Sequence, residues 1–443
     1  MIRFPIRAMV SGVMMSASLG LSGCIFAEPT DPPLPGERIP VMLYDTGIRP
    51  DPELASVPVT VAPPVANAAW PQTGGNASHS LYHLELGPLP KRVFRVDAGE
   101  ESSDEERLLA QPVVDEEGRL FVLDVEAKVT AFDGDSGRRL WRRDLRGDND
   151  RDGTLGAGLA VDRGRVIVTT GFAQVIALDA GTGKTIWRRI VTAPLRAAPT
   201  VAEGRIFAVS IDNQTHALDA TTGDLLWTHR GAPELASLLG GAAPAYQAGI
   251  VVVAYSSGEL FGLRASNGTE MWSDYVARPR RTSAVSHIAD IRASPVIDRG
   301  LVYAVSNSGR MVALNLTNGT RRWERQVAAV QNPWSAGDFL YVVTTDGLLL
   351  CMSRDDGRIR WVRSVPRYAD ERRQRGLVTW SGPILAGDRL ILAGSNEEVL
   401  SISPYTGDLL GRIQMPDPVS IPPLVARNTL YFLTDDAELI AWR

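Results

Sequence analysis

The sequence predicts an all-β fold, an eight-bladed β-propeller of four-stranded antiparallel blades, from three observations. A segment of the order Pro, apolar pair, Gly turn, apolar strand, small-residue strand, Gly, Trp occurs eight times. Stretches such as Arg165–Thr170 and Gln174–Asp179 are short, β-rich and bounded by Gly, Asp and Asn, as strands and hairpin turns require. Successive Trp lie about 40 to 50 residues apart, which is the repeat length of a propeller blade. Each repeat is therefore expected to form one four-stranded sheet.

Most repeats end with a Gly that is followed four residues later by a Trp. The structural Trp predicted in this way are Trp141, Trp187, Trp227, Trp272, Trp323 and Trp361. A seventh repeat has Gly407 in register but Gly411 in the place of the Trp. One position of the third strand is always small, as in Ala177 or Gly262, and this indicates close packing near a crowded axis.

The eighth repeat, Pro423–Trp442, ends before its fourth strand. An open ring would leave strand edges exposed, and such edges promote aggregation. Lys91–Val96 matches the Trp-bearing strand of the other repeats, with Phe94 at the Trp position. The sequence therefore predicts that the two ends of the chain complete blade eight together.

The first residues have the pattern of a secretory lipoprotein signal. Arg3 and Arg7 begin the chain, an apolar stretch follows at Ala8–Leu21, and the small residues Ser22 and Gly23 precede Cys24. Cys24 is predicted to become the lipidated first residue of the mature protein. Ile25, rather than Asp, follows the Cys, which resembles outer-membrane sorting in Gram-negative lipoproteins.

Three segments follow from these patterns. Residues 1–23 are predicted to be the signal peptide, residues 24–69 a lipidated and Pro-rich tether, and residues 70–443 the propeller. The expected location is the periplasmic face of the outer membrane, with the lipid as the anchor. Cys351, in the small-residue position of its strand, is predicted to be a buried structural thiol.

The net charge of −5 and the lack of a basic stripe argue against nucleic acid as a partner. Asp148, Asp150 and Asp152 precede Gly153 as in the first half of a calcium loop. Leu159 stands where a complete loop has its bidentate acid, so this is a weak calcium candidate. No other metal site, no cofactor and no catalytic residue is predicted.

The repeat resembles that of quinoprotein dehydrogenases that bind pyrroloquinoline quinone. A resemblance of this kind implies a shared fold and not a shared chemistry. Those enzymes typically place an adjacent cysteine pair over the cofactor, and this chain has no Cys-Cys. A quinone-dependent dehydrogenase stays an alternative function, as does a periplasmic propeller that binds glycans or peptides.

The signal, the tether and the eight repeats together resemble the BamB family of outer-membrane assembly lipoproteins. The stretches that carry the resemblance are Gly36–Pro40, Trp70–Asn76, Ser308–Leu314, Ser353–Trp361 and Ser403–Gly407. The resemblance implies a non-catalytic scaffold of the β-barrel assembly (BAM) complex. It would dock on the periplasmic POTRA domains of BamA, contact other BAM subunits and help deliver unfolded outer-membrane proteins.

In that family, docking uses two neighbouring inter-blade loops, which correspond here to residues 234–244 and 286–295. Leu238 and Asp290 match the family's apolar and acidic contact positions. Leu239 stands where the better-known pattern has Arg, and Arg292 where it has a second Asp. Together with Leu235, these residues are predicted to form a small interface with an apolar centre and a polar rim.

Overall fold

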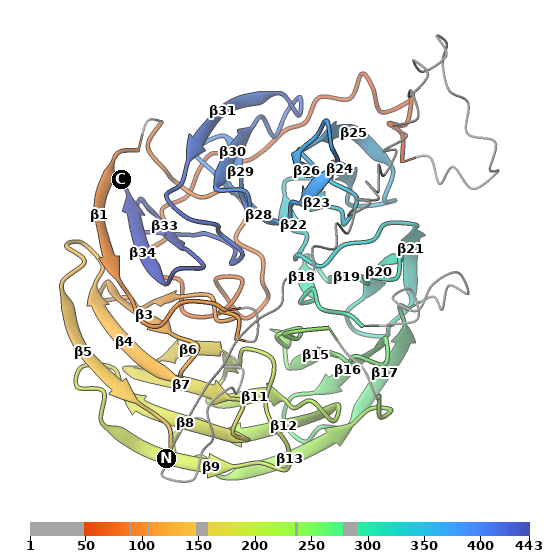
Figure 1. The fold of residues 1–443 in the computed structure, drawn as a ribbon. Coiled ribbons are helices and arrows are strands. Elements are labelled where there is room, and N and C mark those ends of the chain that lie inside the picture. The colour runs from red at the N-terminus through yellow and green to blue at the C-terminus, as the bar shows by residue number, and fades with distance from the viewer. Residues whose placement is uncertain (1–47, 89, 104–105, 148–157, 235–237, 278–289) are drawn as a thin grey trace, which may run out of the picture. The chain divides into compact units, whose positions relative to one another are not determined.

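The computed structural model describes residues 48–88, 90–103, 106–147, 158–234, 238–277 and 290–443. These residues fall within one unit, Gly47–Arg443. Every regular element among them is a strand, and none of them forms a helix with the length and apolarity of a membrane crossing. Eight four-stranded antiparallel sheets form the blades of a ring (Figure 1), which confirms the predicted fold class.

The first four blades follow each other along the chain, and each blade pairs its strands in chain order. Blade 1 contains β2 (Val113–Val114), β3 (Arg119–Leu123), β4 (Lys128–Asp133) and β5 (Arg139–Asp144); blade 2 contains β6 (Gly158–Asp162), β7 (Arg165–Thr170), β8 (Gln174–Asp179) and β9 (Thr185–Ile190); blade 3 contains β10 (Thr200–Ala202), β11 (Arg205–Val209), β12 (Gln214–Asp219) and β13 (Leu225–Arg230); blade 4 contains β14 (Ala245–Gln247), β15 (Ile250–Ala254), β16 (Glu259–Arg264) and β17 (Glu270–Tyr275).

The remaining blades keep the same order until the ring closes. Blade 5 contains β18 (Val296–Asp298), β19 (Leu301–Val305), β20 (Met311–Asn315) and β21 (Arg321–Arg325); blade 6 contains β22 (Trp334–Ala336), β23 (Phe339–Val343), β24 (Leu348–Ser353) and β25 (Ile359–Ser364); blade 7 contains β28 (Trp380–Ala386), β29 (Arg389–Gly394), β30 (Glu398–Ile402) and β31 (Leu409–Gln414); blade 8 contains β32 (Leu424–Ala426), β33 (Thr429–Leu433), β34 (Glu438–Trp442) and β1 (Arg92–Asp97). A short hairpin of β26 (Tyr368–Asp370) and β27 (Arg375–Leu377) precedes blade 7.

The repeated Trp and Gly meet between blades rather than within one blade. Trp227 of blade 3 lies against Gly268 of blade 4, whose φ is +72°, and a Cβ on this Gly would lie 2.6 Å from the indole Cε3. The indole Nε1 also donates to the carbonyl of Ala265, at 3.0 Å. The same contact joins Trp141 to Gly183, Trp187 to Gly223, Trp272 to Gly319, Trp323 to Gly357 and Trp361 to Gly407. The Trp–Gly pair is therefore the element that joins one blade to the next.

The small position of the third strand has a different cause from the one that the sequence analysis gives. In six blades the small residue pairs directly with the Trp of the neighbouring strand, as Ala177 does with Trp187. In the other two blades Ala441 pairs with Phe94, and Ser401 pairs with Gly411. At Gly262, a Cβ would lie 2.1 Å from the indole Cε2 of Trp272. In the six blades with a Trp, the position is small because an indole covers it, and not because it lies near the axis.

Blade 8 closes the ring with the two chain ends, as predicted. β1 pairs with β34, and Phe94 lies opposite Ala441 in the register that the Trp has in the other blades. Phe94 also takes the role of the Trp between blades, because a Cβ on Gly137 of blade 1 would lie 2.7 Å from its ring.

The interface between blades 7 and 8 lacks the Trp–Gly pair. Gly411 occupies the Trp position of β31, and a Cβ built on it meets no atom within 4 Å. A groove of about 510 Å³ lies here, lined by Leu410, Gly411, Ile413 and Trp442 among others. This interface is therefore packed less completely than the seven others.

Residues 67–87, which we call the inner belt, cross the middle of the ring (Figure 1, orange trace). From blade 1 to blade 7, the first strands of neighbouring blades contact each other, so these strands line the axis. The inner belt hydrogen-bonds to the first strand of every blade, at Val114, Val161, Val201, Tyr246, Ile297, Trp334, Leu385 and Val425 for blades 1 to 8. It satisfies backbone groups that the inner edges of the blades would otherwise leave unpaired.

Part of the predicted tether also packs on the ring. The backbone N–H of Asp51 donates to the Ile359 carbonyl at 2.7 Å, and Glu53 forms an ion pair with Arg358. Val59 is buried in the hydrophobic core that includes blades 6 to 8. Residues 51–59 are therefore bound to the propeller and do not act as a free spacer.

Candidate functional site: the loop pair and the axial pocket

The predicted docking residues belong to the segments that lead into blades 4 and 5. Leu238, Leu239, Asp290 and Arg292 lie in the described part of the chain, whereas Leu235 lies outside it. The two segments are in direct contact, because the backbone N–H of Leu238 donates to Oδ2 of Asp290 at 2.7 Å. The structure therefore brings the four described residues into one region.

Asp290 is the buried residue of this region. Its side chain is 0% exposed, and its Oδ2 also lies 3.5 Å from Nη1 of Arg196. Burial raises the pKa of Asp290, while Arg196 and the Leu238 N–H oppose that shift by stabilising the carboxylate. Asp290 is predicted from the sequence to be part of a polar rim, but in the structure it is buried and positions the Leu238 backbone.

The two leucines differ in exposure. Leu239 is 42% exposed, whereas Leu238 is half-buried. A large apolar side chain that is held in water by a well-placed loop is a common element of a protein interface. Leu239 is thus the described apolar residue of the predicted site that a partner could reach; the contact itself stays a prediction.

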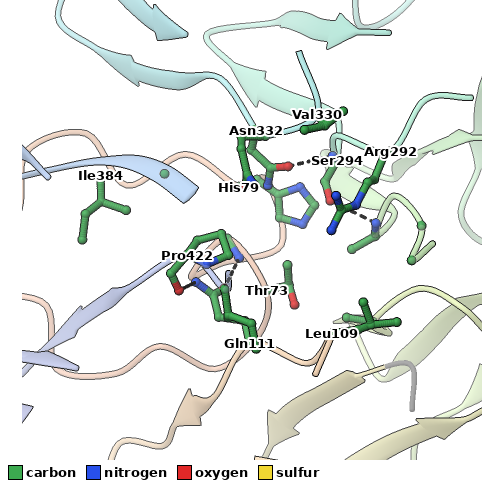
Figure 2. A pocket seen from close by; sticks show the side chains of 18 of the residues that line it. Thr73, His79, Leu109, Gln111, Arg292, Ser294, Val330, Asn332, Ile384 and Pro422 are labelled. Carbon is green, nitrogen blue, oxygen red and sulfur yellow. Dashed lines mark hydrogen bonds between the residues drawn. The ribbon is translucent and has the colours of Figure 1, made fainter. Parts of the chain in front are cut away.

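Arg292 lines a pocket of about 130 Å³ on the axis of the ring (Figure 2). The walls come from the inner belt and from the segments that enter the blades, and they include Thr73, Leu109, Gln111 and Ile384. Gln111 is held by bonds to the carbonyls of Pro422 and Pro423, and its Oε1 accepts from the indole of Trp70. The pocket is therefore built from fixed residues that are far apart in the sequence.

Two arginines and a histidine set the electrostatics of the pocket. Arg196 lines it together with Arg292, whose pKa burial lowers and the nearby Asp290 raises. His79 Nδ1 lies 2.7 Å from the Pro295 carbonyl, so this nitrogen carries the proton. Burial lowers the pKa of His79 to about 4, so the ring is neutral at neutral pH.

Arg196 is not among the residues predicted from the sequence, although the repeat carries a signal for it. Arg196 stands three residues before Pro199, and Arg292 stands three residues before Pro295. Both prolines immediately precede the first strand of a blade, so the two arginines occupy equivalent places near the axis. Alignment of the repeats on this Pro would have predicted that both side chains face the same pocket.

The other predicted site residues fall into two groups. Cys24, Asp148, Asp150 and Asp152 lie outside the described residues. Cys351 is buried, as predicted, and burial raises the pKa of its thiol. Within the described ranges, no group of three or more His, Cys, Asp or Glu side chains is placed to hold a metal ion.

The structure is a β-propeller built from Trp–Gly repeats. It has eight antiparallel blades, and at seven of the eight blade interfaces an aromatic ring packs against a Gly. A cationic pocket lies on its axis. Among such propellers, the chain belongs to the family described as outer membrane protein assembly factor BamB. The model of this family matches residues 91–152 and 125–363.

Individual proteins agree with this assignment. The chain is similar to the BamB of Alkalilimnicola ehrlichii, with 30% identity over 208 residues, which are 47% of this chain and 52% of that protein. It is also similar to the BamB of Shewanella oneidensis, with 25% identity over 332 residues, 71% of this chain and 79% of that protein. The chain spans about half the length of the first of these curated relatives.

A solved structure shares the fold. The crystal structure of BamB from Moraxella catarrhalis matches with a TM-score of 0.67 and covers 80% of this chain and 100% of that one. The sequence identity is 18%, so this likeness concerns the fold alone.

Proposed function

We propose that this chain is a non-catalytic scaffold of the outer-membrane β-barrel assembly complex. It docks on the periplasmic POTRA domains of BamA and helps to assemble and insert barrel proteins into the outer membrane. The observation that carries this proposal is the family match over residues 125–363, because this range contains both predicted docking loops.

The geometry of the loop pair supports docking. The buried Asp290 holds the backbone of Leu238, which places Leu239 next to it in solvent. An apolar side chain on a fixed loop loses little conformational entropy when a partner covers it, and this favours binding.

The experiment is affinity capture of BamA from detergent-solubilised membranes with a tagged form of this chain. Leu239→Glu is expected to lower the recovery of BamA about tenfold, because a charge replaces an apolar contact at the centre of the interface. Leu226→Glu is the matched control, since Leu226 is 46% exposed but lies on β13, the last strand of blade 3. Thermal unfolding of both variants should equal that of the unmodified chain.

The possible outcomes separate the site from the function. Normal recovery with Leu239→Glu would show that the loop assignment is wrong. Failure of the unmodified chain to recover BamA would contradict the scaffold function itself.

The lipid anchor at Cys24 and the position at the periplasmic face are part of the same proposal. Cys24→Ser should move the protein from the membrane fraction to the soluble fraction after cell lysis, because the acyl chains supply the membrane affinity. If the Cys24→Ser chain stayed in the membrane fraction of cells that are depleted of BamA, this result would contradict the lipid anchor at Cys24.

The alternatives have weaker support. A quinone-dependent dehydrogenase is not favoured, since the adjacent cysteine pair is missing from the sequence. A propeller for glycans or peptides predicts capture of such ligands and no BamA, so the capture experiment distinguishes it from the scaffold.

A further inference from the structure

Arg196 has hydrogen-bonding capacity that the protein does not use. Its side chain is only 7% exposed, and its ion pair with Asp290 engages Nη1 alone. Nε and Nη2 are buried and have no acceptor within hydrogen-bond distance among the described residues. Buried N–H groups nearly always find an acceptor, so these two indicate an acceptor that the described residues do not supply. The planar guanidinium fork matches a carboxylate.

The Arg196 side chain runs along the pocket wall past a glycine. Gly241 stands three residues before Pro244, the same place in its repeat that Arg196 and Arg292 have in theirs. Gly241 belongs to the segment that enters blade 4, between those that carry the two arginines. A Cβ on Gly241 would lie only 3.0 Å from Cγ of Arg196. The Gly thus lets the Arg196 side chain extend along the pocket wall.

The pocket has a net positive charge that one anion would neutralise. Arg196 and Arg292 are the charged residues among its described lining. The buried Asp290, which does not line the pocket, neutralises one of these two charges. His79 is neutral, because burial disfavours its protonated form. A single positive charge is left in a poorly solvated space, which is unfavourable until an anion pairs with it.

The remaining walls are suited to an apolar body. Trp70, Leu109 and Ile384 line the pocket, and the Trp70 ring stacks on Trp334 with 6.5 Å between ring centroids. The volume of about 130 Å³ is close to that of the engineered cavity of about 150 Å³ that holds benzene. We propose that the axial pocket binds a small monocarboxylate, with its carboxylate on Arg196 and Arg292 and its apolar body against these walls. The pocket shares Arg292 with the predicted docking loops, but binding of the carboxylate can be measured on this chain without BamA.

Benzoate is a probe of the right charge and size, and benzamide is its neutral counterpart. Isothermal titration calorimetry on the full mature chain is expected to show saturable binding of benzoate. Benzamide should bind at least about tenfold more weakly, since it lacks the charge-assisted hydrogen bonds. Equal binding of the two compounds would refute an anion site. An absence of benzoate binding would show that the pocket holds water only, and it would equally overturn the proposal.

A pair of Arg variants tests the place of binding. Arg292→Gln should weaken benzoate about tenfold or more, because it removes one cationic donor. Arg299→Gln makes the same change of charge outside the pocket, at a side chain that is 50% exposed and paired with Asp338, and should leave the affinity unchanged. Equal affinities of the two variants would place benzoate elsewhere. Arg292 is preferred to Arg196, since loss of Arg196 would leave the buried Asp290 unpaired and endanger folding.

Discussion

The contact between Trp227 and Gly268 provides a quantitative test of how the blades are joined. Gly268→Ala introduces two costs. An Ala at a φ of +72° costs about 1 kcal/mol relative to Gly. Its Cβ would also lie 2.6 Å from the indole, and overpacking of this kind costs about 2 kcal/mol. We expect the free energy of unfolding to fall by about 3 kcal/mol in total.

Gly249→Ala is the matched control in the same blade. Its φ is +79°, and a Cβ there meets no atom within 4 Å. Only the backbone cost of about 1 kcal/mol should apply. Urea unfolding followed by Trp fluorescence measures both variants, with equal slopes expected for the dependence on denaturant. Equal destabilisation of the two variants would refute the Trp–Gly contact as the element that joins the blades.

Three further predictions concern other parts of the ring. Gly411→Trp should fill the groove between blades 7 and 8 and raise the free energy of unfolding by about 1–2 kcal/mol; a lower melting temperature would contradict this. Because burial lowers the pKa of His79 from 6.5 to about 4, the unfolded chain takes up the proton first, so stability is present above pH 6.5 and is lost as the pH falls towards 4. At about pH 5 the loss from this residue is about 2 kcal/mol, and urea unfolding of His79→Gln should show a weaker dependence between neutral pH and pH 5 than the unmodified chain. The Cys351 thiol, whose pKa burial raises, should not react with a thiol reagent in the native Cys24→Ser chain but should react once urea unfolds it; rapid native labelling would contradict its burial.

Much of the fold could be predicted from the repeats, because the residue pattern within each repeat indicates the strands of its own blade. The Pro, the Gly turn and the Trp recur at fixed places, so even the strand from the N-terminal side could be matched by Phe94. The partner of each Trp could not be found in this way. Trp227 and Gly268 belong to different repeats, and the in-strand pattern is the same whether an indole packs within its blade or across to the next one.

Only part of the candidate site could be predicted from the sequence. The loop pair was located through the family resemblance, but burial of Asp290 depends on Arg196, which enters from another blade. The inner belt has no periodicity, and most of its hydrogen bonds are made by the backbone. Its side chains therefore carry little record of the strands that it contacts.

The inner belt also has a consequence for the order of events during folding. It precedes all eight blades in the chain, and one of its distant partners, Val425, lies 358 residues after Asn67. A chain that emerges N-terminus first therefore exposes this segment long before the last blade exists, and contacts of such sequence separation form late. A shortened chain could build several blades but would lack part of the surface on which the belt lies. The belt thus makes completion of the ring a condition for its own folding, so an incomplete chain keeps an unfolded N-terminal segment that proteases can recognise.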